Sequence, residues 1–268
     1  MKKKRADILL FEKGLVESRE KARRVIMEGI VFIGDRKVDK PGEKVDINSP
    51  IGIKKNPNIY VSRGGLKFKK AIDVFHIELE NKTAIDIGAS TGGFTDCMLK
   101  QGIKKVYAID VGYGQLDWKL RKDPRVIVKE RTNIRYVTRE DIGELVDFIS
   151  IDVSFISLRL VLPVARELLS ENGYIMALIK PQFEAGREKV GKKGIVKDKN
   201  IHREVIKTIV EFCEASQLNV IGLDFSPITG TTGNIEFLLY ITKEKENKNV
   251  TINDQMILKI IDKAHRSL

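Results

Sequence analysis

Short runs of apolar residues recur along the chain from residue 84 onward, and stretches with helical spacing lie between them. The apolar runs predict seven strands, at residues 84–87, 106–110, 126–128, 148–153, 174–180, 219–225 and 236–241. Apolar residues three and four positions apart predict helices at 160–169, 201–216 and from 252 to the C-terminus. Strands that alternate with helices predict an α/β fold, a doubly wound, mostly parallel seven-stranded sheet of Rossmann-like type.

The first sixty residues follow a different pattern. They predict two short helices, which end at Gly14 and Gly29, and then a hairpin over residues 31–38. Prolines, asparagines and a lysine pair at residues 48–60 predict a linker that includes a short strand near Ile51. The chain is therefore expected to form a small α+β domain at 1–59 and a large α/β domain at 60–268.

The strand at 84–87 leads into a glycine-rich turn and then a helix from Phe94, with Thr91 or Thr95 as its N-cap. The turn glycines, which let a ligand approach the backbone closely, are Gly88, Gly92 and Gly93. The spacing is G-x-S-x-G-G around Ser90, which differs from the dinucleotide fingerprint G-x-G-x-x-G. The alternative is a tight turn that binds no ligand.

Two acidic residues near this turn indicate which ligand it would take. Asp86 precedes the turn, where it would tolerate a cationic, amino-acid-bearing ligand better than a diphosphate. Asp110 ends the next strand, about 20 residues on, where an acid typically holds a ribose hydroxyl pair. Together they favour S-adenosylmethionine over a dinucleotide.

Polar residues end five of the predicted strands, at positions that meet at one edge of a parallel sheet. They are Asp86, Asp110, Glu130, Asp152 and Lys180. A lysine at the end of a buried strand is costly unless it is paired, so Asp152 is expected to orient Lys180. Glu236, at the start of the last strand, is expected to pair with Lys67. Such lysines could take a proton from a hydroxyl group, or the pairs could be structural salt bridges.

The net charge is +11, and residues 1–60 alone carry 15 Lys and Arg against 9 Asp and Glu. A basic small domain suggests a polyanionic partner, most simply nucleic acid, although a lysine-rich composition can also serve solubility alone. Arg19 and Arg23 share one helix face, with Arg24 beside them. A Gly/Lys-rich segment at residues 184–198 either contacts RNA or is a solvated loop.

The remaining composition limits the classes of protein to consider. Cys97 and Cys213 lie far apart in predicted helices, and the three histidines lie in separate segments, so neither a disulfide framework nor a metal site is expected. No segment reaches 18 apolar residues, and the basic N-terminus lacks the apolar stretch of a signal peptide. A cytoplasmic protein that does not cross a membrane is expected.

Seven motifs resemble the TlyA family within the FtsJ-like ribose methyltransferases: RGGLK, DIGASTGGFTDCML, IDVGYGQL, ERTN, IDVSFISL, KPQFE and GNIEF. The first 46 residues resemble an S4-type RNA-binding domain through S-R-x-x-A-x-x-x-I-x-x-G and the following V-x-I-G. The resemblance implies S-adenosylmethionine-dependent 2′-O-methylation of cytidine in ribosomal RNA, with ribosomal subunits as partners. It leaves the oligomeric state open.

The resemblance also implies roles for individual residues. The implied catalytic set is Lys67, Asp152, Lys180 and Glu236. The implied cofactor-binding residues are Asp86, Gly88, Ser90, Gly92, Gly93, Phe94, Asp110 and Asn133. The implied RNA-binding residues are Arg5, Arg19, Arg23 and Arg24.

Two other classes of function remain open at this level. Members of the resembled family also carry the name haemolysin, so a membrane-active protein is one alternative. An RNA-binding assembly factor with a vestigial cofactor pocket is the other, although the intact Lys-Asp-Lys-Glu set argues against it.

Overall fold

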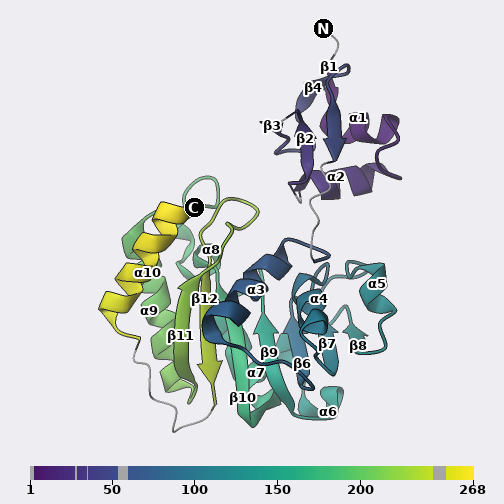
Figure 1. Ribbon diagram of the computed structural model, residues 1–268. Helices are drawn as coiled ribbons and strands as arrows, with labels where there is room; N and C mark the ends of the chain where they lie inside the picture. The colour runs from purple at the N-terminus through teal and green to yellow at the C-terminus, as the bar shows by residue number, and fades with distance from the viewer. Residues whose placement is uncertain (1–2, 28, 35, 54–59, 244–251) are drawn as a thin grey trace. The chain divides into compact units, whose positions relative to one another are not determined.

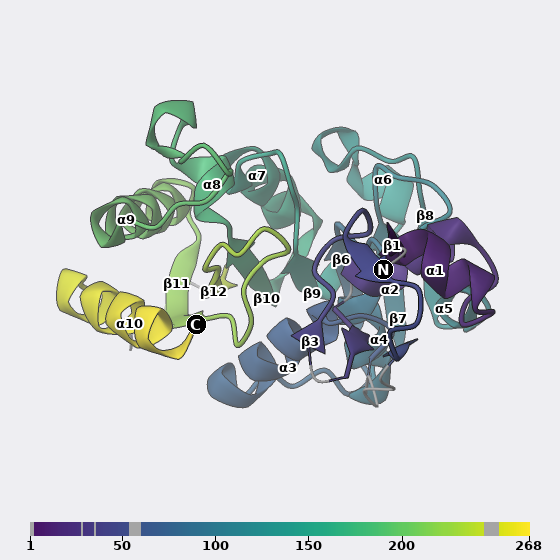
Figure 2. The same cartoon turned by 90° about the horizontal axis from the view of Figure 1, so that it is seen from above.

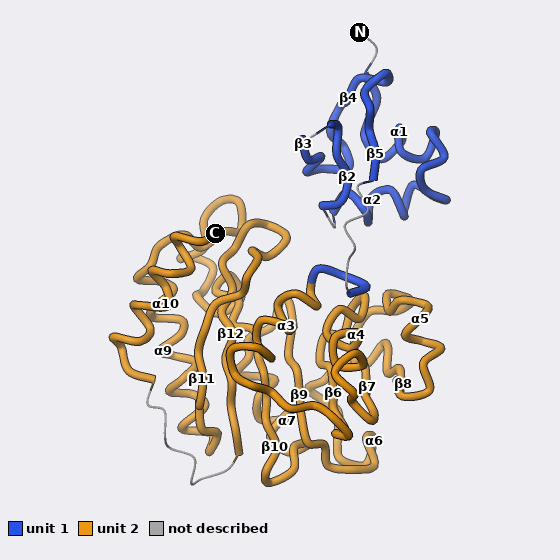
Figure 3. Tube along the Cα trace, viewed as in Figure 1, with its two compact units in different colours: residues 1–63 blue, residues 64–268 orange. Residues whose placement is uncertain are grey.

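The computed structural model describes residues 3–27, 29–34, 36–53, 60–243 and 252–268 (Figure 1). The chain divides into two compact units, residues 1–63 and 64–268 (Figure 3). Residues 54–59 of the predicted linker, and with them the predicted boundary after residue 59, lie outside the described residues, whereas the short strand predicted near Ile51 is present. Each unit has its own apolar core and is described separately.

The small unit has the two helices and the hairpin that the sequence predicts, packed around Leu10, Ile26 and Val31. Strands β1 and β4 pair antiparallel through their backbones, and no apolar pattern predicts them, since β1 has the sequence Lys-Lys-Arg. Its elements are β1 (Lys3–Arg5), α1 (Ala6–Glu12), α2 (Arg19–Met27), β2 (Val31–Ile33), β3 (Arg36–Lys37), β4 (Lys44–Asp46) and β5 (Ile51–Ile53).

The large unit confirms the predicted α/β fold. Its seven-stranded sheet has the order β11-β12-β10-β9-β6-β7-β8, and β6 to β10 run parallel while β12 is antiparallel to both neighbours. The strands are β6 (Thr83–Ile87), β7 (Lys105–Ile109), β8 (Val126–Lys129), β9 (Val146–Ile151), β10 (Leu169–Ile179), β11 (Asn219–Phe225) and β12 (Phe237–Thr242).

Helices cover both faces of this sheet: α3 and α4 lie on one face, and α6, α7 and α9 on the other (Figure 2). Helix α10 packs on α9 and on the edge strand β11. The helices are α3 (Gly64–Phe75), α4 (Gly93–Lys100), α5 (Trp118–Arg121), η1 (Ile134–Tyr136), α6 (Arg139–Ile142), α7 (Leu158–Leu168), α8 (Pro181–Glu184), η2 (Arg187–Lys189), α9 (Lys199–Ala215) and α10 (Asp254–Ser267).

Two local predictions differ from the structure. Gly92 is the N-cap of α4, in the left-handed conformation and without a side-chain cap, so the prediction of Thr91 or Thr95 was wrong. The Thr95 hydroxyl instead donates to the buried Asp86. Strand β10 begins at Leu169, earlier than predicted, and its register against β9 shifts before Tyr174. The predicted core cysteines, Cys97 and Cys213, are buried in α4 and α9.

A buried histidine pair joins α9 to α10 and makes stability sensitive to acid. His202 is fully buried, with its Nδ1 3.0 Å from Nε2 of His265 and its Nε2 3.2 Å from the carbonyl oxygen of Val196. Burial, and then the neighbouring His265, lower the pKa of His202 to about 4. The folded protein therefore holds His202 neutral, whereas an unfolded histidine takes up a proton near pH 6.5.

We expect the free energy of unfolding to fall as the pH drops from 7 to 4, because protonation of His202 then favours the unfolded chain. The pKa difference corresponds to about 3 kcal/mol from this residue. Denaturant unfolding of the parent and of His202→Gln at several pH values measures the contribution. The variant should lose most of this dependence, and equal pH slopes in both proteins would contradict the assignment.

Candidate active site

The turn after β6 brings the backbones of two strand ends together. Gly88 has φ +82°, and a Cβ at this position would lie 2.4 Å from the carbonyl oxygen of Asp152, beyond the end of β9. Ser90 also has positive φ, and its amide donates to Oδ2 of Asp110 at 2.8 Å. Oδ1 of Asp110 accepts from the amide of Gly112 at 2.7 Å. The Asp110 carboxylate thus fixes the loops after β6 and β7 against each other.

Gly88→Ala is expected to damage this junction. The left-handed conformation costs an L-residue about 1–2 kcal/mol, and the methyl group would also meet a backbone oxygen that cannot move independently. The variant should be less stable by at least about that amount and should lose most of the methyl-transfer activity that the seven motifs imply. Gly114→Ala is the matched control, because Gly114 also has positive φ but an added Cβ meets nothing within 4 Å. Equal losses in both variants would show that only backbone strain matters.

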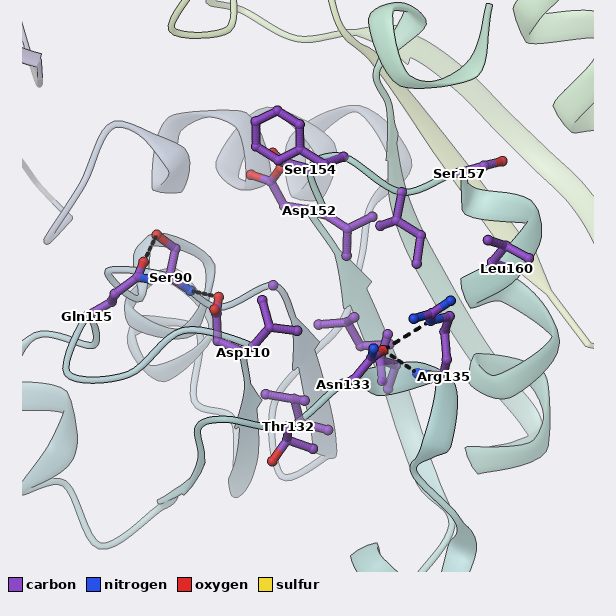
Figure 4. A pocket seen from close by; sticks show the side chains of 18 residues that line it. Ser90, Asp110, Gln115, Thr132, Asn133, Arg135, Asp152, Ser154, Ser157 and Leu160 are labelled. Atoms are coloured by element: carbon purple, nitrogen blue, oxygen red, sulfur yellow. Dashed lines mark hydrogen bonds between the residues drawn. The ribbon is translucent and has the colours of Figure 1, made fainter. Parts of the chain in front are cut away.

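A cavity of about 680 Å³ opens at the carboxyl ends of β6, β7 and β9 (Figure 4). Polar side chains that line it include Ser90, Asp110, Gln115, Asn133 and Asp152. Ile109, Ile134 and Val153 add apolar wall. The cavity has the size and the mixed lining of a small-molecule site.

Four of the eight predicted cofactor residues line this cavity, and four do not. Gly88, Ser90, Asp110 and Asn133 line it. Asp86 is buried, and its carboxylate accepts from the amide and hydroxyl of Thr95 and from the hydroxyl of Ser150. Burial raises the pKa of Asp86 to about 6. Its contacts show that it joins β6 to α4, and a direct ligand contact stays a prediction.

The other three residues outside the cavity lining build the turn behind it. Gly92 packs so closely that a Cβ would lie 2.2 Å from Cδ1 of Leu120. Gly93 begins α4, and Phe94 is buried with its ring stacked on Phe68 at 5.1 Å. Their predicted role toward a ligand is therefore supported only as a role in shaping the turn.

The four predicted catalytic residues converge at the same edge of the sheet. Lys67 on α3 donates to Oε2 of Glu236 at 2.6 Å, and its Nζ lies 3.9 Å from Oδ2 of Asp152. Nζ of Lys180 lies 2.5 Å from Oδ1 of Asp152 and donates to Oγ of Ser154 at 3.1 Å. Side chains up to 169 residues apart in the sequence thus form one series of alternating charges, from Glu236 to Lys180.

Burial makes this series a strongly interacting unit. The side chains of Lys67 and Lys180 are each 10% exposed, and that of Glu236 is 3% exposed. Burial would raise the pKa of Asp152, but the ammonium groups of Lys67 and Lys180 outweigh it and keep this pKa below its usual value. Apart from the ion pair with Lys180, Oδ1 of Asp152 accepts no hydrogen bond from the described residues.

Several residues of the site were missed by the sequence analysis. Ser154 contacts Lys180, and Gln115 accepts a hydrogen bond from Ser90 at 3.2 Å. Phe155 has positive φ and is 91% exposed, and its ring lies 4.9 Å from that of Phe183 at the cavity rim. An aromatic residue directly after the Asp152 loop was the available signal. Glu130, predicted at the shared site, instead accepts from the backbone amide of Gly114.

In the small unit, three of the four predicted RNA-binding arginines meet at one buried carboxylate. Arg5 pairs with both oxygens of Asp7 at 2.9 Å, Arg23 lies 3.3 Å and Arg19 3.5 Å from Oδ2. These contacts, chiefly with Arg5, lower the pKa of Asp7 to about 2. The arginine side chains remain 43–56% exposed. Three cations around one anion leave a positive surface that can bind phosphate.

Among the described residues, no three His, Cys, Asp or Glu side chains gather as a metal site would require. No helix in the described part of the chain combines the length and apolar character needed to span a bilayer.

Comparisons with known proteins match both units. The FtsJ-like methyltransferase pattern matches residues 60–243, and the S4 domain pattern matches residues 4–51. YqxC of Bacillus subtilis is 54% identical over 100% of this chain and 96% of its own length. A 16S/23S rRNA (cytidine-2′-O)-methyltransferase, TlyA of Mycobacterium tuberculosis, is 39% identical over 90% of this chain and 91% of its own.

A solved structure from Streptococcus thermophilus, described under the word hemolysin, is similar over the whole length. It is 47% identical with a TM-score of 0.78, and the match covers 100% of this chain and 97% of that one. The resemblance inferred from the seven motifs is thereby confirmed. The chain belongs to the FtsJ-like methyltransferase family, carries an S4 domain at its N-terminal end and is a homologue of TlyA.

Proposed function

We propose that this protein transfers the methyl group of S-adenosylmethionine to the 2′-hydroxyl of a cytidine in ribosomal RNA. The observation that carries the proposal is the buried series Glu236–Lys67–Asp152–Lys180, which meets the cavity at Asp152. Two amines and two acids in direct contact suit proton removal from a hydroxyl. The activity named for the TlyA relative supports cytidine and ribosomal RNA as the substrate.

The residues of the cavity fit S-adenosylmethionine. Asp110 would hold the ribose hydroxyls, and the apolar side chains of Ile109 and Ile134 would contact the adenine ring, with Asn133 beside them. Gly88 and Ser90 line the cavity at the turn after β6, where they would contact the methionine arm. The group, when bound, supplies an electrophilic methyl on its sulfonium sulfur.

Lys180 is our candidate for the base. Asp152 and Ser154 fix its Nζ at the end of β10. After Lys180 has given up its own proton to solvent, its neutral amine would accept the proton of the 2′-hydroxyl. Lys67, held by Glu236, would place a positive charge near the oxygen as negative charge develops on it. Positioning of the hydroxyl against an activated methyl donor would account for much of the rate.

The exposed ring of Phe155, which lines the cavity, would orient the target nucleoside, with the half-buried ring of Phe183 packed against it. A base that leaves its stack can rest on such an aromatic face. The arginines around Asp7 would hold the RNA backbone elsewhere, as the S4 domain suggests.

The proposal is tested with the purified full-length chain, methyl-labelled S-adenosylmethionine and ribosomal subunits from cells that lack the gene. Label is expected in the RNA of the subunits, and isothermal titration should show binding of S-adenosylmethionine. Absence of label from the RNA of both subunits, under conditions where the cofactor binds, would refute the catalytic proposal. Leakage of dye from liposomes with the same preparation would favour the membrane-active alternative.

A further inference from the structure

The segment at residues 186–197, here called the basic loop, carries a concentrated positive charge. It lies outside the four proposed catalytic residues Glu236, Lys67, Asp152 and Lys180, here called the catalytic chain. It contains five Lys and Arg and one acid, a net charge of +4 in twelve residues of a chain whose total is +11. Lys192 and Lys193, at its tip, are exposed and have no ion-pair partner among the described residues. By contrast, Lys189 in the same loop pairs with Glu204.

The base of the loop is held by two buried side chains. The Val196 amide donates to Oδ1 of Asn234 at 2.9 Å, and its carbonyl oxygen lies 3.2 Å from Nε2 of His202. Asn234 and His202 are both fully buried, and Val196 is 2% exposed. Nδ2 of Asn234 also donates to the Gly194 carbonyl at 2.8 Å. Of the two alternatives for this segment, a loosely solvated loop does not fit these contacts.

The tip itself is a closed turn. The Gly194 amide donates to the Gly191 carbonyl at 2.8 Å, and the Gly191 amide donates to the Ile195 carbonyl at 3.2 Å. Lys192 and Lys193 are the two residues between Gly191 and Gly194, so both hydrogen bonds close the turn that carries them. A turn closed in this way loses less conformational entropy when its lysines bind a ligand than a flexible segment would.

Asn234, which holds the base of the basic loop, is close in sequence to Glu236 of the catalytic chain. Asn234 precedes Glu236 by two residues, and the Gly230 amide donates to the Asn234 carbonyl at 2.8 Å. A Cβ on Gly230 would lie 2.5 Å from Oε1 of Glu236, so this loop also closes over the carboxylate that holds Lys67. The loops after β10 and before β12 lie at the same edge of the sheet (Figure 1).

We propose that the basic loop binds the RNA phosphate backbone next to the target ribose, with Lys192 and Lys193 as the contacts. This inference rests on the proposed RNA substrate and adds a contact surface on the methyltransferase domain itself. Lysine ammonium groups bind phosphate as point charges and release counterions from the RNA. A fixed distance from the loop base to Glu236 would present the backbone at a defined position relative to Lys180.

The test compares the full-length parent with Lys192→Ala/Lys193→Ala, using the same ribosomal subunits at several salt concentrations. Loss of two phosphate contacts should weaken the binding of subunits about tenfold near 150 mM salt. The plot of log K for binding against log salt should become less steep, with its negative slope about 1.5 closer to zero. KM for subunits should rise while kcat at saturating subunits and the affinity for S-adenosylmethionine stay within about twofold. Binding and slope equal to those of the parent would overturn the proposal.

The matched control is Lys82→Ala/Lys104→Ala, which removes the same charge at the opposite edge of the sheet, before β6 and β7. This control should bind subunits as tightly as the parent. If its affinity for subunits falls as much as that of Lys192→Ala/Lys193→Ala, net charge alone explains the effect and the proposal is overturned. Asn234→Ala keeps both lysines but releases the base of the loop, so it should also weaken binding.

The two proposals can fail separately. If the parent binds subunits but transfers no methyl group, the catalytic proposal fails while the lysine comparison still tests the basic loop. If the parent transfers methyl groups and the lysine variant matches it in KM and salt slope, only the inference about the loop fails.

Discussion

Lys180→Ala is expected to lower methyl transfer at least about a thousandfold, in line with the loss of a general base together with its charge. Nζ of Lys180 lies at the end of the buried series Glu236–Lys67–Asp152–Lys180, 2.5 Å from Oδ1 of Asp152. Affinity for S-adenosylmethionine should remain within a few-fold, because Lys180 does not line the cavity. Single-turnover methyl transfer and cofactor titration measure the two quantities.

Two further variants separate the role of Lys180 from a loss of stability. Lys243 is also a shielded, ion-paired lysine, with its side chain 8% exposed beside Glu171, but it follows β12 at the other edge of the sheet. Lys243→Ala should therefore remain active. Lys180→Arg keeps the positive charge but does not give up its proton, so it should remain nearly inactive. Activity near the parent level in Lys180→Ala would contradict the assignment.

Asp152→Asn is expected to abolish methyl transfer and also to destabilise the large unit. The Asp152 carboxylate lies between the ammonium groups of Lys67 and Lys180, and its removal leaves two shielded cations with one carboxylate. Breaking a buried pair in this way costs about 3 kcal/mol. Denaturant unfolding and a methyl-transfer assay on the same preparation measure both effects.

A second substitution tests the electrostatic cause. Asp152→Asn/Lys180→Met removes the unpaired cation as well, so it should recover part of the lost stability and stay inactive. Asp224→Asn is the matched control, because Asp224 is a similarly shielded carboxylate 3.5 Å from Lys70, on β11. It should transfer methyl groups like the parent. If the double variant is less stable than Asp152→Asn, repulsion between the lysines is not the cause.

The sequence predicts the large sheet well for a physical reason. Strands buried on both faces must be short apolar runs, and polar residues such as Asp110 and Lys180 mark their ends. Strand β1 cannot be predicted in this way, because Lys3–Arg5 has no apolar residue and is held by backbone pairing with β4. The end of a strand can thus be predicted from polarity, whereas a strand held only by its backbone cannot.

Part of the membership of the site can be predicted from the sequence, but the orientations of its side chains cannot. Asp86 and Asp110 both end apolar strands, yet Asp86 is buried against Thr95 while Asp110 lines the cavity. Which way each carboxylate turns depends on partners distant in sequence, here Ser150 and Ser90. Phe155 was missed because an aromatic residue usually belongs to a core, and its positive φ, visible only in the structure, turns it outward.

The arginines of the small unit show the same limit. Helical spacing places Arg19 and Arg23 on one face, but only the fold brings Arg5 to the same carboxylate of Asp7. Asp7 reads as a charged helix residue in the sequence, yet it is fully buried in the structure. A buried acid among exposed arginines organises their geometry, which residue spacing alone does not indicate.

The central claim is that the chain from Glu236 to Lys180 removes the proton of a ribose 2′-hydroxyl during methyl transfer. The most direct measurement digests the reacted ribosomal RNA to nucleosides and identifies the methylated product by mass spectrometry, for the parent and for Lys180→Arg. We predict 2′-O-methylcytidine with the parent and almost none with the variant. Methylation on a base, or equal amounts of 2′-O-methylcytidine from both proteins, would contradict the account.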